Sequence, residues 1–233
     1  MSGLFDTGLI LLLAVVLPGL LLLQAPMVRQ LLMSEQAPRR AFLYLQSMAM
    51  QWILVGVAIL VWIGGDRSLA QAGFRIPPER GFWIGAAIVA TVGIALSLLS
   101  QMVARRLTWR LAFLRAMPQA TEKLIPATPK DLSLFLPVAV TAGFCEELLF
   151  RGILPALLYA RGADLALAGA ISAVAFGLMH AYQGVRGVLV TAAMGGLFFA
   201  LTLLSNSLLP AMALHGLYDW FLARANVAAR SGL

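Results

Sequence analysis

The sequence predicts an all-α fold, a polytopic membrane bundle of about seven transmembrane helices with an eighth possible. Composition is the first reason, because the 233 residues are 61% hydrophobic and only 12% charged, whereas a soluble chain is about a quarter charged. The second reason is that the apolar runs approach the length of about 20 residues that a spanning helix needs. The length of the chain suits one integral membrane domain, 1–233.

The apolar runs are separated by proline, glycine and charged residues, which predict the connectors. The predicted spans are 4–24, 42–63, 82–103, 132–154, 163–182, 187–204 and 208–224. Pro26 is expected to fall in the first connector. The first run has neither a basic start nor a small-residue cleavage site, so we interpret it as a retained helix rather than a signal peptide.

Cationic residues are distributed unevenly among the connectors. Placing the N-terminus outside puts most of the 17 Lys and Arg residues on the cytoplasmic side, which predicts an N-out, C-in orientation. The short loops and the many arginines favour a bacterial inner membrane. The formal charge of +7 does not indicate a nucleic-acid partner, because no basic stripe carries interleaved aromatic residues. In the long basic connector, Leu107, Leu111 and Leu114 share a helical face, which predicts a helix at the membrane surface.

Ionisable residues inside the predicted spans are confined to the C-terminal half. The first three spans contain almost none apart from Asp6, which lies at the start of the first. The later spans contain Glu146, Glu147, His180, His215 and Asp219. A charged side chain at mid-bilayer costs roughly 3 kcal/mol on insertion scales, so such residues indicate a functional site by default.

Helical spacing sorts the acidic residues. Glu147 and Arg151 are four residues apart and are expected to pair, which gives Glu147 a supporting role. Glu146 lies about 100° around the helix and has no local cation, so it is the freer carboxylate. Pro155 is expected to kink this helix just after Arg151.

The histidines have the same four-residue spacing to a neighbour. Phe176 precedes His180 by four residues, and His215 precedes Asp219 by four. Three helices are therefore expected to present polar faces to a common point, where Glu146 is available as a general base for water.

Hydrolysis is the chemistry that these residue types favour, and the spacing leaves its form open. His180 would orient the water, and His215 with Asp219 would stabilise the oxyanion or hold the geometry. Alternatively Glu146, His180 and His215 would bind zinc, since two histidines and a glutamate are a known catalytic set.

Three motifs in order resemble those of the CPBP intramembrane protease family, which includes the CAAX prenyl endopeptidases of the Rce type. They are EELLFR at 146–151, FGLMH at 176–180 and HGLYD at 215–219. The resemblance implies a catalytic core at 132–224, with 1–131 as accessory helices and basic connector.

Carried over by position, the resemblance implies a role for each residue. Glu146 is expected to activate water with His180, and His215 is the second catalytic histidine, aided by Asp219. The supporting positions are taken by Glu147, Arg151 and Phe176. A glutamate mechanism without a cofactor is favoured over a zinc-dependent one. Asp219 stands where the best-known members have asparagine, which can donate a hydrogen bond where an ionised aspartate cannot.

The expected function is therefore an intramembrane endopeptidase that cuts a membrane-associated protein or peptide within or near the lipid bilayer. A prenylated substrate is less expected in a bacterium. A second hypothesis is a non-enzymatic immunity or scaffolding protein that keeps the motifs for packing. A third is a proton-coupled carrier, which the absence of an inverted repeat disfavours.

Overall fold

The structure is a computed structural model that describes residues 2–231, and this part of the chain contains helices and no strand. The predicted all-α membrane bundle is confirmed. The N-terminal half contains α1 (Ser2–Leu11), a π-helical turn η1 (Leu12–Val16), α2 (Leu17–Met33), α3 (Arg40–Gly64), α4 (Arg80–Arg105), α5 (Leu107–Ala116) and α6 (Gln119–Leu124). The C-terminal half contains α7 (Pro129–Glu147), a second π-helical turn η2 (Leu148–Ile153), α8 (Leu154–Ala160), α9 (Leu165–Met179), the 3₁₀ turn η3 (Ala181–Gln183), α10 (Val185–Ser205) and α11 (Leu209–Arg230).

Five helical segments are long and apolar enough to cross a membrane. They are Gly3–Met33, Arg40–Gly64, Arg80–Arg105, Pro129–Ala160 and Ala181–Ser205. The two remaining predicted spans also form helices, but α9 is shorter and α11 carries polar residues along its 22 residues. Because α11 packs on α4, α7 and α10, it crosses the bundle among other helices.

The two longest helical rods each contain a π-helical turn just before a proline. In the first rod, η1 precedes Pro18 of α2, and the helix continues through Pro26 to Met33. The prediction that Pro26 lies in a connector was wrong. A proline removes one backbone donor, and a wider turn beside it accommodates the missing bond without ending the helix. In the second rod, the π-helical turn η2 contains Arg151 and precedes Pro155, and the segment stays helical from Pro129 to Ala160. The kink expected just after Arg151 stays a prediction.

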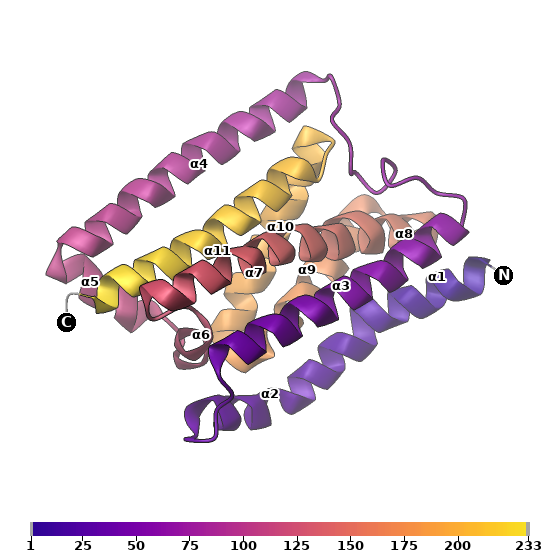
Figure 1. The fold of residues 1–233 in the computed structure, drawn as a ribbon. Helices are drawn as coiled ribbons and strands as arrows, with labels where there is room; N and C mark the ends of the chain where they lie inside the picture. Colours follow the sequence, from indigo (N-terminus) through magenta and orange to yellow (C-terminus); the bar gives the residue numbers. More distant parts are fainter. Residues whose placement is uncertain (1, 232–233) are drawn as a thin grey trace.

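The C-terminal helices form the interior of the bundle. Figure 1 shows α7 and α11 running side by side through the centre, with α3 on one flank and α4 on the other. Helices α9 and α10 also pack against each other. The largest apolar cluster joins residues of the rod from α7 to α8 with α1, α3 and α9. The N-terminal helices therefore surround a core supplied by the C-terminal half.

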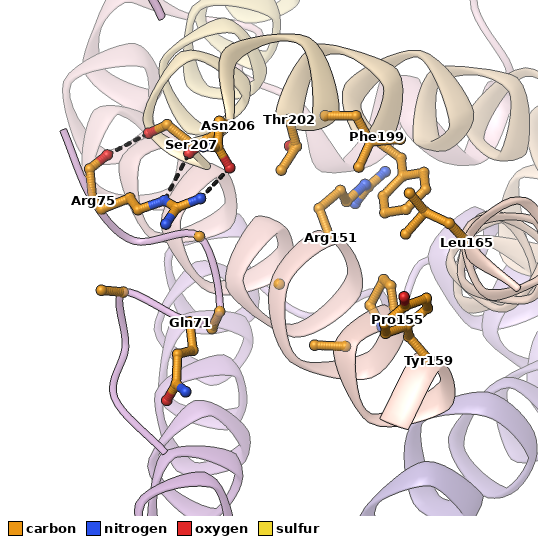
Figure 2. A pocket seen from close by; sticks show the side chains of 16 residues that line it. Gln71, Arg75, Arg151, Pro155, Tyr159, Leu165, Phe199, Thr202, Asn206 and Ser207 are labelled. Atoms are coloured by element: carbon orange, nitrogen blue, oxygen red, sulfur yellow. Dashed lines mark hydrogen bonds between the residues drawn. The ribbon is translucent and has the colours of Figure 1, made fainter. Parts of the chain in front are cut away.

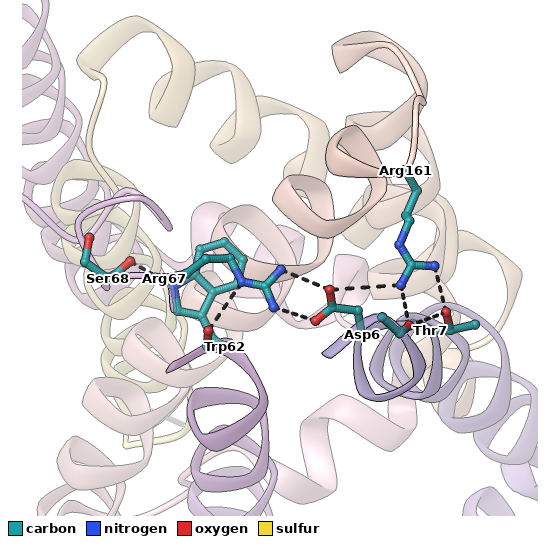
Figure 3. Close-up of polar contacts among 7 residues, drawn as sticks. Asp6, Thr7, Trp62, Arg67, Ser68 and Arg161 are labelled. Atoms are coloured by element: carbon teal, nitrogen blue, oxygen red, sulfur yellow. Dashed lines mark hydrogen bonds and ion pairs between the residues drawn. The ribbon is translucent and has the colours of Figure 1, made fainter. Parts of the chain in front are cut away.

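Polar contacts fasten the N-terminal helix to the bundle near its beginning (Figure 3). Asp6 pairs with Arg67, which stands 4.6 Å from the centre of the Trp62 ring, and it lies 4.0 Å from Arg161. Arg161 also donates to the hydroxyl of Thr7 at 2.7 Å. The one ionisable residue expected in the first span is thus neutralised at the helix end.

The basic connector forms two short helices beside the core. Helix α5 has no buried residue, and its Phe113 and Leu114 pack against the cluster around Phe221 of α11. The expected helix is therefore present, and its position at the membrane surface stays a prediction. Nothing in the structure tests the division into an accessory part at 1–131 and a catalytic core at 132–224, which stays a prediction.

Candidate active site

A buried ion pair lies at the centre of the rod formed by α7, η2 and α8. Arg151 Nη1 is 3.1 Å from Glu147 Oε1, and the two side chains are 1% and 0% exposed. The four-residue spacing predicted this pair. Because both side chains are enclosed, water cannot hydrate either charge, and each charge is stabilised by the other instead.

His215 of α11 extends this pair across to a second helix. Its Nδ1 donates to Glu147 Oε1 over 2.7 Å, since an ionised carboxylate can only accept. The other ring nitrogen, Nε2, then faces Glu146 Oε2 at 3.7 Å and Asp219 Oδ2 at 3.8 Å. Glu147 thus sets the orientation of the imidazole, and the sequence did not predict this contact.

Two glycines allow α7 and α11 to approach closely enough for that hydrogen bond. A Cβ at Gly143 of α7 would lie 2.7 Å from the carbonyl oxygen of Met212 and 3.0 Å from the nitrogen of Gly216. A Cβ at Gly216 would in turn lie 3.3 Å from the carbonyl oxygen of Ala139. Small residues at a crossing let backbones approach, as in other membrane helix pairs.

Arg151 is also held from its other side. Its Nε donates to the carbonyl of Gly195 at 3.3 Å, and its guanidinium stands 4.0 Å from the centre of the Phe176 ring. A Cβ at Gly195 would lie 3.0 Å from Arg151 Nη2, so a glycine makes room for the guanidinium. Phe198 lies 5.4 Å from His215, ring centre to ring centre, and was not predicted as part of the site.

His180 lies at the end of α9 rather than inside a helix. Its Nδ1 is 2.9 Å from the carbonyl oxygen of Phe176, and its ring centre is 4.9 Å from that of Phe176. The ring centre of Phe176 is also 6.1 Å from that of His215, so both imidazoles contact one aromatic ring. Among the described residues, His180 has no hydrogen bond or ion pair with Glu146, the partner expected from the sequence.

The exposed fractions distinguish the three carboxylates. The side chain of Glu147 is 0% exposed, whereas those of Glu146 and Asp219 are 18% and 24% exposed. The enclosed Glu147 is therefore closed to water, whereas Glu146 and Asp219 can be reached by it. The partly exposed carboxylate of Glu146 thus lies beside the imidazole of His215, whose other nitrogen is hydrogen-bonded to Glu147.

The same residues do not form a metal-ligand set in this arrangement. No group of three or more His, Cys, Asp or Glu side chains within residues 2–231 is placed to hold a metal ion. We therefore derive no chemical step through zinc, and the expectation of a mechanism without a cofactor stays a prediction.

A separate cavity of about 260 Å³ lies on the other side of Arg151 (Figure 2). Its polar lining includes Thr202 and a cluster in which Arg75 donates to Asn206 and the hydroxyl of Ser207 donates to the Arg75 carbonyl. Neither a carboxylate nor an imidazole is among the residues that line it. The groups suited to hydrolysis thus lie around His215, and this cavity lies behind them.

One family model matches the half of the chain that contains the candidate active site. Residues 128–221 match the family model described as type II CAAX prenyl endopeptidase Rce1-like. This segment is similar to that family and is termed the Rce1-like segment. The resemblance expected from the three motifs is therefore confirmed, and the match contains every predicted site residue. No curated protein and no solved structure matches the chain.

The Rce1-like segment and the apolar helices together give the general class of the protein. It is an integral membrane protein, and its matching segment is similar to a family of CAAX-type endopeptidases. The segment begins one residue before α7 and ends within α11, so it coincides with the helices that form the interior.

Proposed function

We propose that the protein is an intramembrane endopeptidase in which Glu146 activates water. The observation that carries the proposal is the chain of contacts from Arg151 through Glu147 to His215. This chain fixes the imidazole so that Nε2 faces the partly exposed Glu146. Packing alone would not require a buried ion pair and a histidine that bridges two carboxylates.

In the proposed reaction, Glu146 takes a proton from water as the water oxygen attacks the carbonyl carbon of the scissile peptide bond. When both ring nitrogens of His215 carry protons, Nε2–H can donate to the oxyanion that forms on the carbonyl oxygen. The carbon–nitrogen bond then breaks, and Glu146 returns its proton to the leaving amine. Glu147 and Arg151 stay in place and keep His215 oriented.

We assign His180 to the water as well. His180 and His215 both contact the Phe176 ring, so a water or substrate bound beside this ring would reach His180 as well as Glu146. Catalytic hydrogen bonds are often completed only when substrate binds. Asp219, 3.8 Å from Nε2, is assigned the role of holding His215 from the open side.

The proposed substrate is a membrane-associated protein or peptide. Its peptide bond would be cut near the membrane, at the core helices formed by residues 132–224. A prenylated substrate is not required, because a carboxylate and an imidazole act on the peptide bond itself. The competing functions are a non-enzymatic immunity or scaffolding protein, a zinc-dependent form of the protease and a proton-coupled carrier.

The test compares cells that carry the wild-type protein, Glu146→Gln or Glu35→Gln. The control Glu35 is an exposed glutamate between α2 and α3. New protein termini are mapped in membrane and secreted fractions. A terminus present with wild type and Glu35→Gln but absent with Glu146→Gln supports proteolysis and names the substrate. Identical termini in all three, at equal folded levels, would favour the scaffolding role.

The metal question is then settled with purified protein and the substrate so found. Full activity in the presence of a zinc chelator supports the glutamate mechanism. Activity that is lost on chelation and restored by zinc would replace it with the metal-dependent form.

A further inference from the structure

A basic cavity lies at the turn between α2 and α3, away from the candidate active site. Its volume is about 240 Å³, and α6 contributes Lys123 to its lining beside Arg39 and Arg40. Figure 1 shows this turn next to α6, at the end of the bundle where α3 and α7 begin. No carboxylate is among the residues that line the cavity.

Arg40 forms a fixed wall of the cavity. Its Nε donates to the carbonyl of Lys123 at 3.0 Å, and its Nη1 is 3.4 Å from Asp131 of α7. These contacts tie the start of α3 to α6 and α7. The backbone at Arg39, next to Arg40, and at Lys123 is therefore held together by the side chain of Arg40.

Arg39 and Lys123 themselves are exposed cations. Within residues 2–231, neither side chain forms a hydrogen bond or an ion pair. Two unpaired cations that share a cavity without a carboxylate repel each other unless an anion binds between them. The cavity is thus electrostatically suited to a phosphate group.

Apolar residues line part of the cavity, and further apolar residues of the same two helix ends are exposed. Leu32 and Leu43 line it, and Leu31, Met33 and Phe42 are exposed beside it. These residues end α2 and begin α3, and both helices belong to segments that could span a membrane. A molecule with a phosphate and acyl chains would place its charge on the cations and its chains on this surface.

We propose that this cavity binds the phosphate of an anionic phospholipid headgroup, with Arg39 and Lys123 as its charged contacts. Basic pockets between membrane helices bind headgroups in this way, and each cation near the surface favours anionic lipid. The apolar rim favours a lipid over a free phosphate ion. The site is separate from the proteolytic one, so its test does not depend on any cleavage.

The experiment measures which lipids stay bound to the detergent-solubilised protein by native mass spectrometry. Phosphatidylglycerol and phosphatidylcholine with identical acyl chains are offered at equal concentration. We expect the wild-type protein to retain phosphatidylglycerol preferentially. Replacing two cations, in Arg39→Gln/Lys123→Gln, is expected to reduce this preference about tenfold. The matched control Arg186→Gln/Arg224→Gln removes two exposed cations that do not line the cavity and is expected to keep it.

Two results would overturn the proposal. An equal loss of preference in both double variants would show that total charge, rather than this cavity, attracts the lipid. The second arm adds inorganic phosphate as a competitor at the concentration of the lipid. If phosphate at that concentration removes the bound phosphatidylglycerol from the protein, the cavity is a site for free anions.

Discussion

In the apolar 18-residue stretch of α4, 6% of the residues are buried inside the protein. In the corresponding stretch of the rod from α7 to α8, 56% of the residues are buried. The two regions handle charge accordingly. The N-terminal helices keep Asp6 at a helix end, beside arginines from two connectors. The Rce1-like segment holds Glu147 and Arg151 in mid-rod with almost no exposure. Charge is placed deep in the bundle only where other helices enclose it.

The glycines differ in the same way. A Cβ added at Gly8, Gly19 or Gly56 in the N-terminal helices would meet nothing within 4 Å. A Cβ added at Gly143 or Gly177 would lie 2.7 Å from a backbone oxygen of a neighbouring helix. Gly81 and Gly85 are exceptions in α4, because a Cβ there would meet Leu204 and Ser205 of α10. At the other positions named, the C-terminal helices are fitted closely to one another, whereas the N-terminal helices leave open space.

The largest expected effect is the loss of activity on removing the histidine that joins the carboxylates. We expect His215→Gln to lower the cleavage rate by roughly 10²- to 10⁴-fold, because the imidazole would no longer stand beside Glu146. Gln46→Ala, at an exposed position of α3, is expected to leave the rate unchanged. The measurement is cleavage of the substrate found by terminus mapping. Equal rates for His215→Gln and wild type would contradict the proposed mechanism.

The second effect concerns stability and follows from the buried ion pair. Glu147→Leu leaves Arg151 enclosed without its partner, which is expected to destabilise the fold by about 3–5 kcal/mol. Glu147→Leu/Arg151→Met removes both charges and is expected to recover part of that loss. Unfolding in detergent micelles measures both variants. If the double variant is no more stable than Glu147→Leu, the unpaired charge of Arg151 is not the reason for the loss of stability.

The third effect compares one glycine from each region. Gly143→Ala is expected to cost about 1–3 kcal/mol, because the new methyl group would overlap the backbone of α11. Gly56→Ala adds the same methyl group to open space in α3 and is expected to be neutral or to stabilise by up to about 1 kcal/mol. Thermal unfolding of the two variants checks the difference. An equal loss of stability in both variants would contradict the proposed difference in packing between α3 and α7.

The smallest expected effect is at the contacts that fasten the N-terminal helix. Asp6→Asn is expected to cost about 1 kcal/mol or less, because the pair lies at a helix end where Asp6 and Arg67 keep 14% and 19% exposure and the asparagine oxygen can still accept from Arg67. Cleavage should change less than twofold, and the same assays measure both quantities. A loss of activity as large as that of His215→Gln would show that the N-terminal helix takes part in catalysis.

The helices could be predicted from the sequence because their signals are local. Apolar runs marked the seven predicted spans, each of which forms a helix, although five helical segments are long and apolar enough to cross a membrane. Thr128, whose side chain accepts from the Asp131 nitrogen, starts α7 beside Pro129 as capping residues do. Pro26 misled the prediction of the first connector. Whether a proline ends a helix or is accommodated in it depends on the neighbouring turn and on packing, which the local sequence does not reveal.

The candidate site could be predicted only in part, for the same reason. The Glu147–Arg151 pair and the approach of His215 to Asp219 follow from four-residue spacing within one helix. The hydrogen bond from His215 to Glu147 joins residues 68 positions apart and depends on how α11 crosses α7. His180 was expected beside Glu146, but α9 ends before it and its ring bonds to the Phe176 carbonyl.

The local character of the Glu147–Arg151 pair has a consequence for how the protein is made. Because both residues belong to one helical rod, their charges can be neutralised as soon as that segment becomes helical, before any other helix has docked. The segment can then leave the ribosome and partition into lipid as a nearly neutral unit. His215 is synthesised 68 residues later, so the hydrogen bond that orients it is the step that closes the site once the last helix arrives.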